Sequence, residues 1–372
     1  MPSRPSRESR PLAHVVGLRS VRRGAATMHG KAFLRASGFL SALLALCLSV
    51  AAPAARAASG NEPPRFDVPA SGAGDALTFV VYADTRFTRN DKVANPIARR
   101  ALVEKIALEH PAAILIGGDI VNQGSDPQDY KVYRSETTRW KEDKIPVFPV
   151  LGNHEFKGCD ANVEPCLENW WNTFGSERPY RWYSVTIGST LRALILDSDA
   201  ALKRGSEQRA WFEQQIADAD ADPNVKFILI MLHHPPVRDP FYTSKGDEKE
   251  VERYLSRRAP SLHAQVIVVG SHVHNYERYM RNGVTYLVSG GGGAPPVPAA
   301  RLFGELSKLR TSVNYHYIRF VLERGQLSAT MVRFDATEQL ASAWTAPDHF
   351  EITAKRSKVP LPPLARDAVA TN

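Results

Sequence analysis

Five segments of the sequence carry side chains that can bind metal ions, and each follows an apolar run typical of a buried strand. These side chains are carboxylates, an amide and imidazoles: Asp84, Asp119, Asn153 with His154, His233 with His234, and His272 with His274. A single aspartate or histidine after a strand is ordinarily a turn or structural residue, but five such strand ends indicate a shared site. Because ligands bind outside the carboxyl ends of strands in open α/β sheets, we expect these side chains to converge.

The types of these residues favour one kind of chemistry. Imidazole and carboxylate ligands together suit zinc, manganese and iron ions. The donors are numerous enough for two ions, and a carboxylate such as Asp119 can bridge them. Two ions roughly 3.5–4 Å apart are a common arrangement for phosphate ester chemistry, because one activates water and both stabilise the charge on the phosphoryl oxygens. The residues therefore predict a two-metal hydrolase that acts on a small phosphorylated substrate.

The segments that must position these residues alternate between short apolar strands and helices. Strands are expected at 77–83, 112–117, 147–151, 181–187, 191–196, 227–232, 265–269, 284–288, 315–322 and 327–334. Helices are expected at 96–110, 126–140, 207–219 and 248–258. Helices interleaved with strands that are apolar throughout predict an α/β fold.

In their order along the chain, the five segments resemble the motifs of the calcineurin-like metallophosphoesterase superfamily, and most of all those of its purple acid phosphatase branch. The most specific are Gly152-Asn-His-Glu155 and His272-Val-His-Asn-Tyr-Glu-Arg278. The resemblance covers residues 84–278, about half of the chain. It implies a four-layer α-β-β-α sandwich of two mixed sheets, with a single catalytic domain over 77–352.

The resemblance also implies which residues bind metal. The first ion would be held by Asp84, Asp119 and His274. The second ion would be held by Asp119, Asn153, His233 and His272, so that Asp119 bridges the two. Their identities, among iron, manganese and zinc, stay open.

Two histidines have further implied roles. His154 would stand beside the phosphate as an acid or charge stabiliser, and Asn153 would help to orient the phosphate. His234 stays open as an alternative ligand to His233, which we prefer because the family's ligand usually stands two residues before the proline.

Three positions depart from the family's pattern. The usual Asp-x-His reads Asp84-Thr85-Arg86, so the first ion loses a histidine and keeps three recognisable ligands. Asn122 replaces the tyrosine that colours purple acid phosphatases, and Asn122 or water could complete the first site. Ser271 replaces a glycine. The fork of Arg86 fits phosphate oxygens, which predicts a phosphate clamp, with a structural salt bridge as the alternative.

These departures leave three functions open. Hydrolysis of phosphate monoesters is the preferred interpretation. A phosphodiesterase or nucleotidase is the alternative among enzymes, and the altered first site makes a non-catalytic phosphate- or metal-binding relative the alternative outside them.

The excess positive charge of the chain lies at its N-terminus. The 372 residues carry a net charge of +8, and residues 1–57 hold nine basic residues against one acidic residue, so the rest is neutral overall. A basic protein would suggest a nucleic-acid or membrane partner, but the neutral remainder indicates no nucleic-acid-binding surface.

The same N-terminal segment has the layout of a secretory signal. A basic stretch at 28–35 precedes an apolar run at 39–52, and Ala55-Arg-Ala57 matches a signal peptidase site. The run is shorter than the ~20 residues that span a bilayer, so we expect a periplasmic or secreted protein without a membrane span after cleavage. Cys159 and Cys166 then predict a disulfide, with free thiols as the alternative. Residues 58–76 read as a linker and 353–372 as a flexible tail.

Overall fold

The computed structural model describes residues 62–70, 72, 76–160, 162–175, 179–239, 246–297, 315–338 and 342–355. The predicted secretory signal and residues 356–372 of the predicted tail lie outside this part of the chain. Among the residues described, no helix combines the length and the apolar character needed to cross a bilayer.

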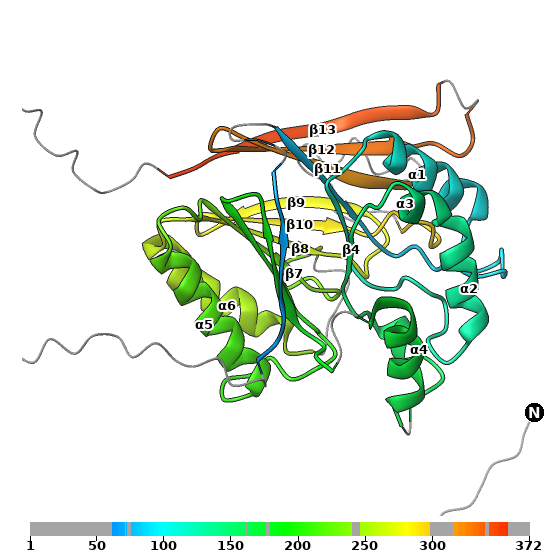
Figure 1. The fold of residues 1–372 in the computed structure, drawn as a ribbon, viewed down its shortest axis with the longest axis horizontal. Coiled ribbons are helices and arrows are strands. Elements are labelled where there is room, and N and C mark those ends of the chain that lie inside the picture. Colours follow the sequence, from blue (N-terminus) through cyan, green and yellow to red (C-terminus); the bar gives the residue numbers. More distant parts are fainter. Residues whose placement is uncertain are drawn as a thin grey trace, which may run out of the picture. The chain divides into compact units, whose positions relative to one another are not determined.

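Two mixed sheets form the centre of the fold (Figure 1). The first has the strand order β1-β5-β6-β7-β8-β10-β9. Its strands are β1 Arg65–Val68, β5 Tyr183–Ile187, β6 Leu191–Ile195, β7 Phe227–Met231, β8 Gln265–Gly270, β9 Tyr276–Arg281 and β10 Val284–Ser289. The second has the order β13-β12-β11-β2-β3-β4. Its strands are β2 Leu77–Tyr82, β3 Ala113–Ile116, β4 Val147–Pro149, β11 Tyr315–Glu323, β12 Gln326–Phe334 and β13 Trp344–Thr353.

Parallel pairing decides where the functional loops emerge. In the second sheet β2, β3 and β4 are parallel neighbours, and in the first sheet β6, β7 and β8 are parallel neighbours. The carboxyl ends of parallel strands meet at one edge of a sheet. The loops after β2, β3, β4, β7 and β8, which carry the predicted ligands, therefore leave their sheets at such edges.

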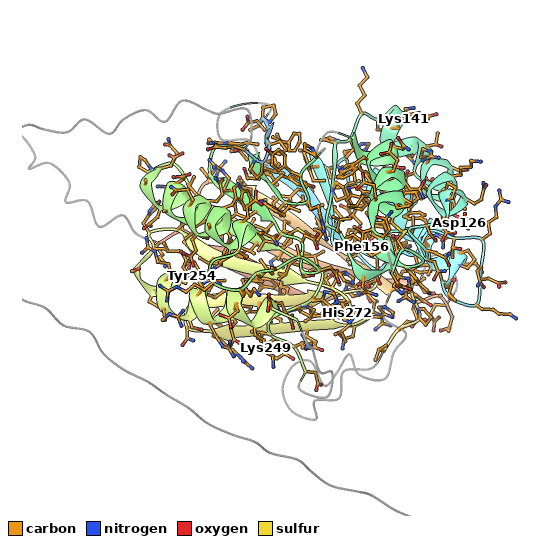
Figure 2. The ribbon with its side chains drawn as sticks, turned by 90° about the horizontal axis from the view of Figure 1, so that it is seen from below. Asp126, Lys141, Phe156, Lys249, Tyr254 and His272 are labelled. Carbon is orange, nitrogen blue, oxygen red and sulfur yellow. A yellow bond between two sulfur atoms is a disulfide. The ribbon has the colours of Figure 1, made fainter. Side chains whose placement is uncertain are left out.

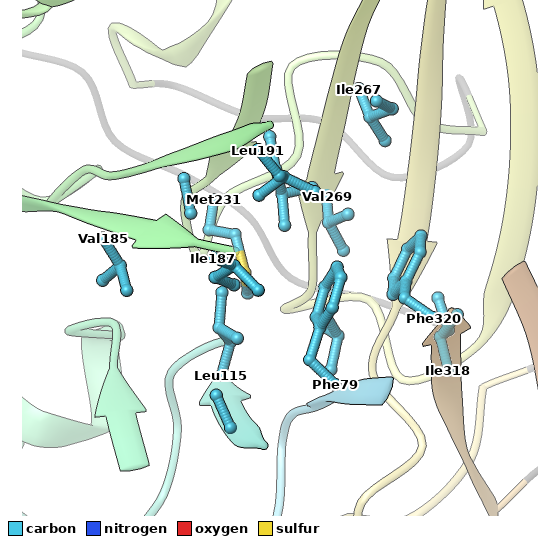
Figure 3. Close-up of a cluster of buried hydrophobic side chains, with 14 of the residues drawn as sticks. Phe79, Leu115, Val185, Ile187, Leu191, Met231, Ile267, Val269, Ile318 and Phe320 are labelled. Carbon is cyan, nitrogen blue, oxygen red and sulfur yellow. The ribbon is translucent and has the colours of Figure 1, made fainter. Parts of the chain in front are cut away.

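Apolar side chains from both sheets fill the space between them. Figure 3 shows Phe79 and Phe320 of the second sheet opposite Val269 of the first. The rings of Phe79 and Phe320 stack with their centroids 4.9 Å apart. Burial of apolar surface is the main favourable term in folding, so this layer holds the two sheets, and with them the two sets of loops, in a fixed relation.

Helices cover the outer face of each sheet. The outer face of the second sheet packs against α1 Pro96–Leu108, α2 Pro127–Glu136, α3 Thr138–Glu142 and α4 Glu164–Phe174. The outer face of the first sheet packs against α5 Glu207–Ala221 and α6 Glu248–Arg258, which lie side by side in Figure 1. The described part of the chain also contains two short 3-10 helices, η1 Asn153–Phe156 and η3 Ala259–Ser261. The predicted four-layer α-β-β-α sandwich of two mixed sheets is confirmed.

Four local predictions need correction. The predicted linker contains β1, whose Phe66 pairs with Val185 and packs against the core between the sheets. Strands β9 and β13 were not predicted, because β9 is rich in charge and the exposed β13 pairs only along one edge. The expected helix 126–140 is divided at Thr137, whose hydroxyl donates to the carbonyl of Tyr133.

The predicted disulfide is present. Cys159 and Cys166 are joined with an S–S distance of 2.07 Å and a Cα–Cα distance of 6.2 Å. The bond links the loop after η1 to α4, so it fixes the segment that follows the Gly152-Asn-His-Glu155 motif.

Candidate metal centre

The structure brings the predicted residues of both sheets together. Main-chain hydrogen bonds tie the loops to one another: Asp84 N donates to Gly118 O at 3.1 Å, and Ser271 N donates to His233 O at 2.9 Å. In Figure 2, His272 lies close to Phe156, which belongs to η1, the short helix that carries Asn153 and His154. The expected convergence of the five strand ends is therefore what the fold produces.

Four donor atoms at the second metal position lie at the spacing of a coordination shell. His233 Nε2 is 3.2 Å from Asp119 Oδ1 and 3.1 Å from Asn153 Oδ1. His272 Nδ1 is 3.0 Å from Asn153 Oδ1 and 3.2 Å from His233 Nε2. Ligands about 2.1 Å from an ion lie roughly 3.0–3.4 Å apart from each other in octahedral or tetrahedral geometry. His233 Nε2 thus lies at ligand spacing from Asp119, Asn153 and His272. Among the described residues, two groups of donors have ligand atoms within 4.8 Å of one another, His233 with His234 and His272, and His233 with Asp84 and Asp119.

The orientation of the His233 ring is fixed from behind. Its Nδ1 lies 3.0 Å from the carbonyl of Gly117 and 3.1 Å from Ser271 Oγ. Because a carbonyl can only accept, Nδ1 carries a proton, and Nε2 is the ring nitrogen directed into the site. Ser271, which replaces the family's glycine, thus contributes a contact to a ligand, a role that the sequence did not reveal.

The neighbouring His234 is held in a different direction. Its Nδ1 lies 2.8 Å from Ser198 Oγ, which also accepts a hydrogen bond from the His234 main-chain N–H. The ring of His234 lies beside that of His272, with centroids 4.3 Å apart. Of the two adjacent histidines, His233 is the one whose nitrogen joins Asp119 and Asn153, so the geometry favours His233 as the ligand.

The first metal position has a different composition. His274 Nε2 lies 3.5 Å from Asp84 Oδ1. Arg86 Nη2 reaches into the same place, 3.3 Å from His274 Nε2 and 3.5 Å from Asp119 Oδ2. For Arg86, a structural salt bridge was the predicted alternative to a phosphate clamp, and its ion pair with Asp119 is such a salt bridge.

His154 stands at the edge of the centre with one ring nitrogen available. Its Nδ1 lies 2.6 Å from the carbonyl of Asn122, its main-chain N–H donates to Asp119 Oδ1, and its Nε2 lies 3.8 Å from Asp119 Oδ2. Burial, the largest influence, lowers the pKa of the His154 ring. The contact of Nδ1 with the Asn122 carbonyl orients this ring.

Glu155 connects the two loops that carry Asp119 and Asn153. Its carboxylate accepts hydrogen bonds from the main-chain N–H groups of Asp119, Ile120, Val121 and Gly152. The side chain is buried. Glu155 is thus a positioning residue that fixes the loops around the ligands.

The electrostatics of the centre reflect two buried carboxylates. Burial is the main cause that raises the pKa of Asp84 to about 7, against the opposing charge of His233. Burial lowers the pKa of His233, but the charge and hydrogen bond of Asp119 together with the charge of Asp84 outweigh it, with a net rise to about 10. Asp84 Oδ1 and Asp119 Oδ2 are buried and form no hydrogen bond with any described residue. Both oxygens lie at the first position, where a positive charge would neutralise them.

A glycine-rich loop packs directly against the Asp84 loop. Gly290–Gly293 are buried. Gly292 N donates to Ala83 O at 2.7 Å, and Ala294 N donates to Asp84 O at 2.9 Å. A Cβ at Gly290 would lie 2.6 Å from Asp84 Oδ2. The absence of a side chain at this position lets the loop approach a predicted ligand.

The sequence profile of the calcineurin-like phosphoesterase family matches residues 77–276, which is more than half of the chain. The chain belongs to the calcineurin-like phosphoesterase family. This family match includes the loops that carry Asp84, Asp119, Asn153, His233 and His272. The expectation from the sequence motifs is thereby confirmed at the level of the family.

Two curated relatives are similar over part of their length. The glycerophosphodiester phosphodiesterase GpdQ of Enterobacter lignolyticus is 30% identical over 178 residues, which cover 45% of this chain and 57% of the relative. An uncharacterized protein of Mycobacterium tuberculosis is 26% identical over 254 residues, which cover 60% of this chain and 44% of the relative. The chain spans about half the length of the curated relatives it matches.

Solved structures show the same fold. Purple acid phosphatase PPD1 from yellow lupin has a TM-score of 0.58 at 17% identity, over 76% of this chain and 54% of that one. GAP50, the anchor in the inner membrane complex of Plasmodium, has a TM-score of 0.55 at 16% identity, over 76% of this chain and 90% of that one. These similarities establish the architecture of the two sheets.

Proposed function

We propose that this chain is an exported, metal-dependent hydrolase of phosphate esters. The observation that carries the proposal is the position of His233 Nε2, which lies 3.1–3.2 Å from donor atoms of Asp119, Asn153 and His272. A zinc, manganese or iron ion held there would lower the pKa of a bound water and polarise a phosphoryl oxygen. At the first position, the sequence predicted an additional ion held by Asp84, Asp119 and His274.

The chain's own residues supply the remaining parts of the reaction. The amide group of Asn153 stands beside His233 and His272 and orients the phosphate. His154 presents Nε2 at the edge of the centre and stabilises the charge that develops on the leaving group, as an acid or hydrogen-bond donor. Arg86 adds a fixed positive charge within the centre, suited to phosphate oxygens.

A substrate panel tests this proposal. Purified protein would be stripped of metal with a chelator, reloaded with Mn²⁺, Zn²⁺ or Fe²⁺, and assayed with p-nitrophenyl phosphate and bis(p-nitrophenyl) phosphate. We expect hydrolysis of the monoester that returns with metal and is lost in His233→Ala. A matched control is His349→Ala, because His349 lies on β13, away from the centre, in an exposed pair with Thr330.

A phosphodiesterase is the second candidate, supported by the name of the relative GpdQ, a glycerophosphodiester phosphodiesterase. Turnover of the diester in preference to the monoester would support it. Bound metal without turnover of either ester would instead support a non-catalytic phosphate- or metal-binding protein.

A further inference from the structure

We propose that the guanidinium group of Arg86 takes the place of the first metal ion, so that the centre holds one ion, at the second position. The inference rests on the metal centre of the proposed function and goes beyond it by giving the number of ions. It starts from the replacement of the family's histidine by Arg86, and from where the structure places that side chain.

The histidine at the first position already has a cationic partner. His274 Nδ1 lies 2.9 Å from the carbonyl of Pro295. Because this carbonyl can only accept, Nδ1 is the protonated nitrogen and Nε2 carries the lone pair. Arg86 Nη2, which can only donate, lies 3.3 Å from that lone pair. The arginine therefore occupies the side of His274 that would otherwise bind metal.

The bridging carboxylate completes the same arrangement. Asp119 Oδ2, the oxygen not directed at His233, lies 3.5 Å from Arg86 Nη2. One nitrogen of the guanidinium thus approaches acceptor atoms of two of the three predicted first-site ligands. Arginine keeps its positive charge at any pH relevant to the protein, so it neutralises the carboxylate and repels a second cation from the same atoms.

The position of Arg86 is held by the main chain around it. Arg86 N donates to Asp119 O at 2.9 Å, and Phe87 N donates to Ile120 O at 2.6 Å. The Arg86 side chain is only 16% exposed. These bonds fasten the strand end that carries Arg86 to the loop that carries Asp119, so the guanidinium is a built part of the centre.

The second position contrasts with the first. The side-chain atoms of Asn153, His233 and His272 contact one another. His233 Nε2 also lies 3.2 Å from Asp119 Oδ1 and 3.1 Å from Asn153 Oδ1, a spacing at which these atoms can share one ion. The structure therefore separates a position that fits a metal ion from one that an arginine fills.

Metal stoichiometry tests the inference without reference to turnover. Wild-type protein, Arg86→His and Arg86→Lys would be stripped of metal, saturated with Mn²⁺, freed of excess ion, and analysed by elemental mass spectrometry and electron paramagnetic resonance. We expect one ion per chain and an isolated Mn²⁺ spectrum for the wild type. Arg86→His, which restores the family's motif, should bind two ions and show spin coupling, whereas Arg86→Lys, which keeps the charge, should bind one.

The outcomes separate this inference from the proposed function. Two ions per wild-type chain, or a single ion in folded Arg86→His, would overturn the replacement while leaving metal-dependent hydrolysis intact. Loss of the wild-type ion in His233→Ala supports the second position, and its retention would overturn it. No ion in any variant would overturn both proposals. Thermal melting establishes that each variant is folded. The number of ions per wild-type chain is measured on the unsubstituted protein, so a variant that fails to fold does not affect it.

Discussion

Replacement of Glu155 by glutamine removes half of a buried network of hydrogen bonds. Oε1 accepts from the N–H groups of Ile120 and Val121, and Oε2 accepts from those of Asp119 and Gly152. A glutamine has one oxygen, so in either orientation its NH₂ group faces two main-chain donors. Each buried donor left without an acceptor costs about 1–3 kcal/mol. The expected loss of stability is therefore about 2–6 kcal/mol.

Equilibrium unfolding in urea measures this loss. The midpoint and slope would be followed by circular dichroism and by tryptophan fluorescence, so that coincidence of the two curves establishes a single transition. Glu142→Gln is the matched control, because Glu142 is exposed at the end of α3 and should change stability by no more than about 0.5 kcal/mol. A Glu155→Gln protein within about 1 kcal/mol of the wild type would refute the network argument. Because the network includes the Asp119 main chain, kcat should fall as well.

Three further predictions follow from the same structure. His154→Ala should lower kcat by about 10²–10⁴-fold while leaving the number of bound ions unchanged, because a general acid or donor is lost but no ligand; an unaltered kcat contradicts its role. The double substitution Cys159→Ala with Cys166→Ala should lower the free energy of unfolding by about 2–3 kcal/mol, measured by urea unfolding against the oxidised wild type, and an unchanged midpoint would count against the bond. For export, N-terminal sequencing of protein recovered outside the cytoplasm should give a first residue just after Ala57, and a start before Ala55 would exclude the proposed signal.

Much of the centre was predictable because its residues follow apolar strands of recognisable pattern. Asp84, Asp119 and His233 come shortly after β2, β3 and β7, whose residues are nearly all buried. The topology of parallel strands then places these ends together. The spacing to the following proline favoured His233 over His234, but only the direction of the side chains shows that His233 Nε2 is the nitrogen that meets Asp119.

Other parts of the molecule could not be predicted, for physical reasons that differ. Strand β1 lies in a stretch rich in glycine and proline, and it is stabilised by pairing with β5, more than a hundred residues away. The contacts of Ser271 and of Gly290 come from the close approach of separate loops. The two roles considered for Arg86 differ only in what its guanidinium touches, so the sequence left both open.

A titration of metal-stripped protein with Mn²⁺, in which bound ion and hydrolysis of p-nitrophenyl phosphate are measured on the same samples, tests the central claim most directly. The account predicts that turnover rises in proportion to bound ion and reaches its plateau at one ion per chain, and that His233→Ala shows neither tight binding nor turnover. Hydrolysis by the metal-free protein, at the rate of the reloaded enzyme, would contradict it.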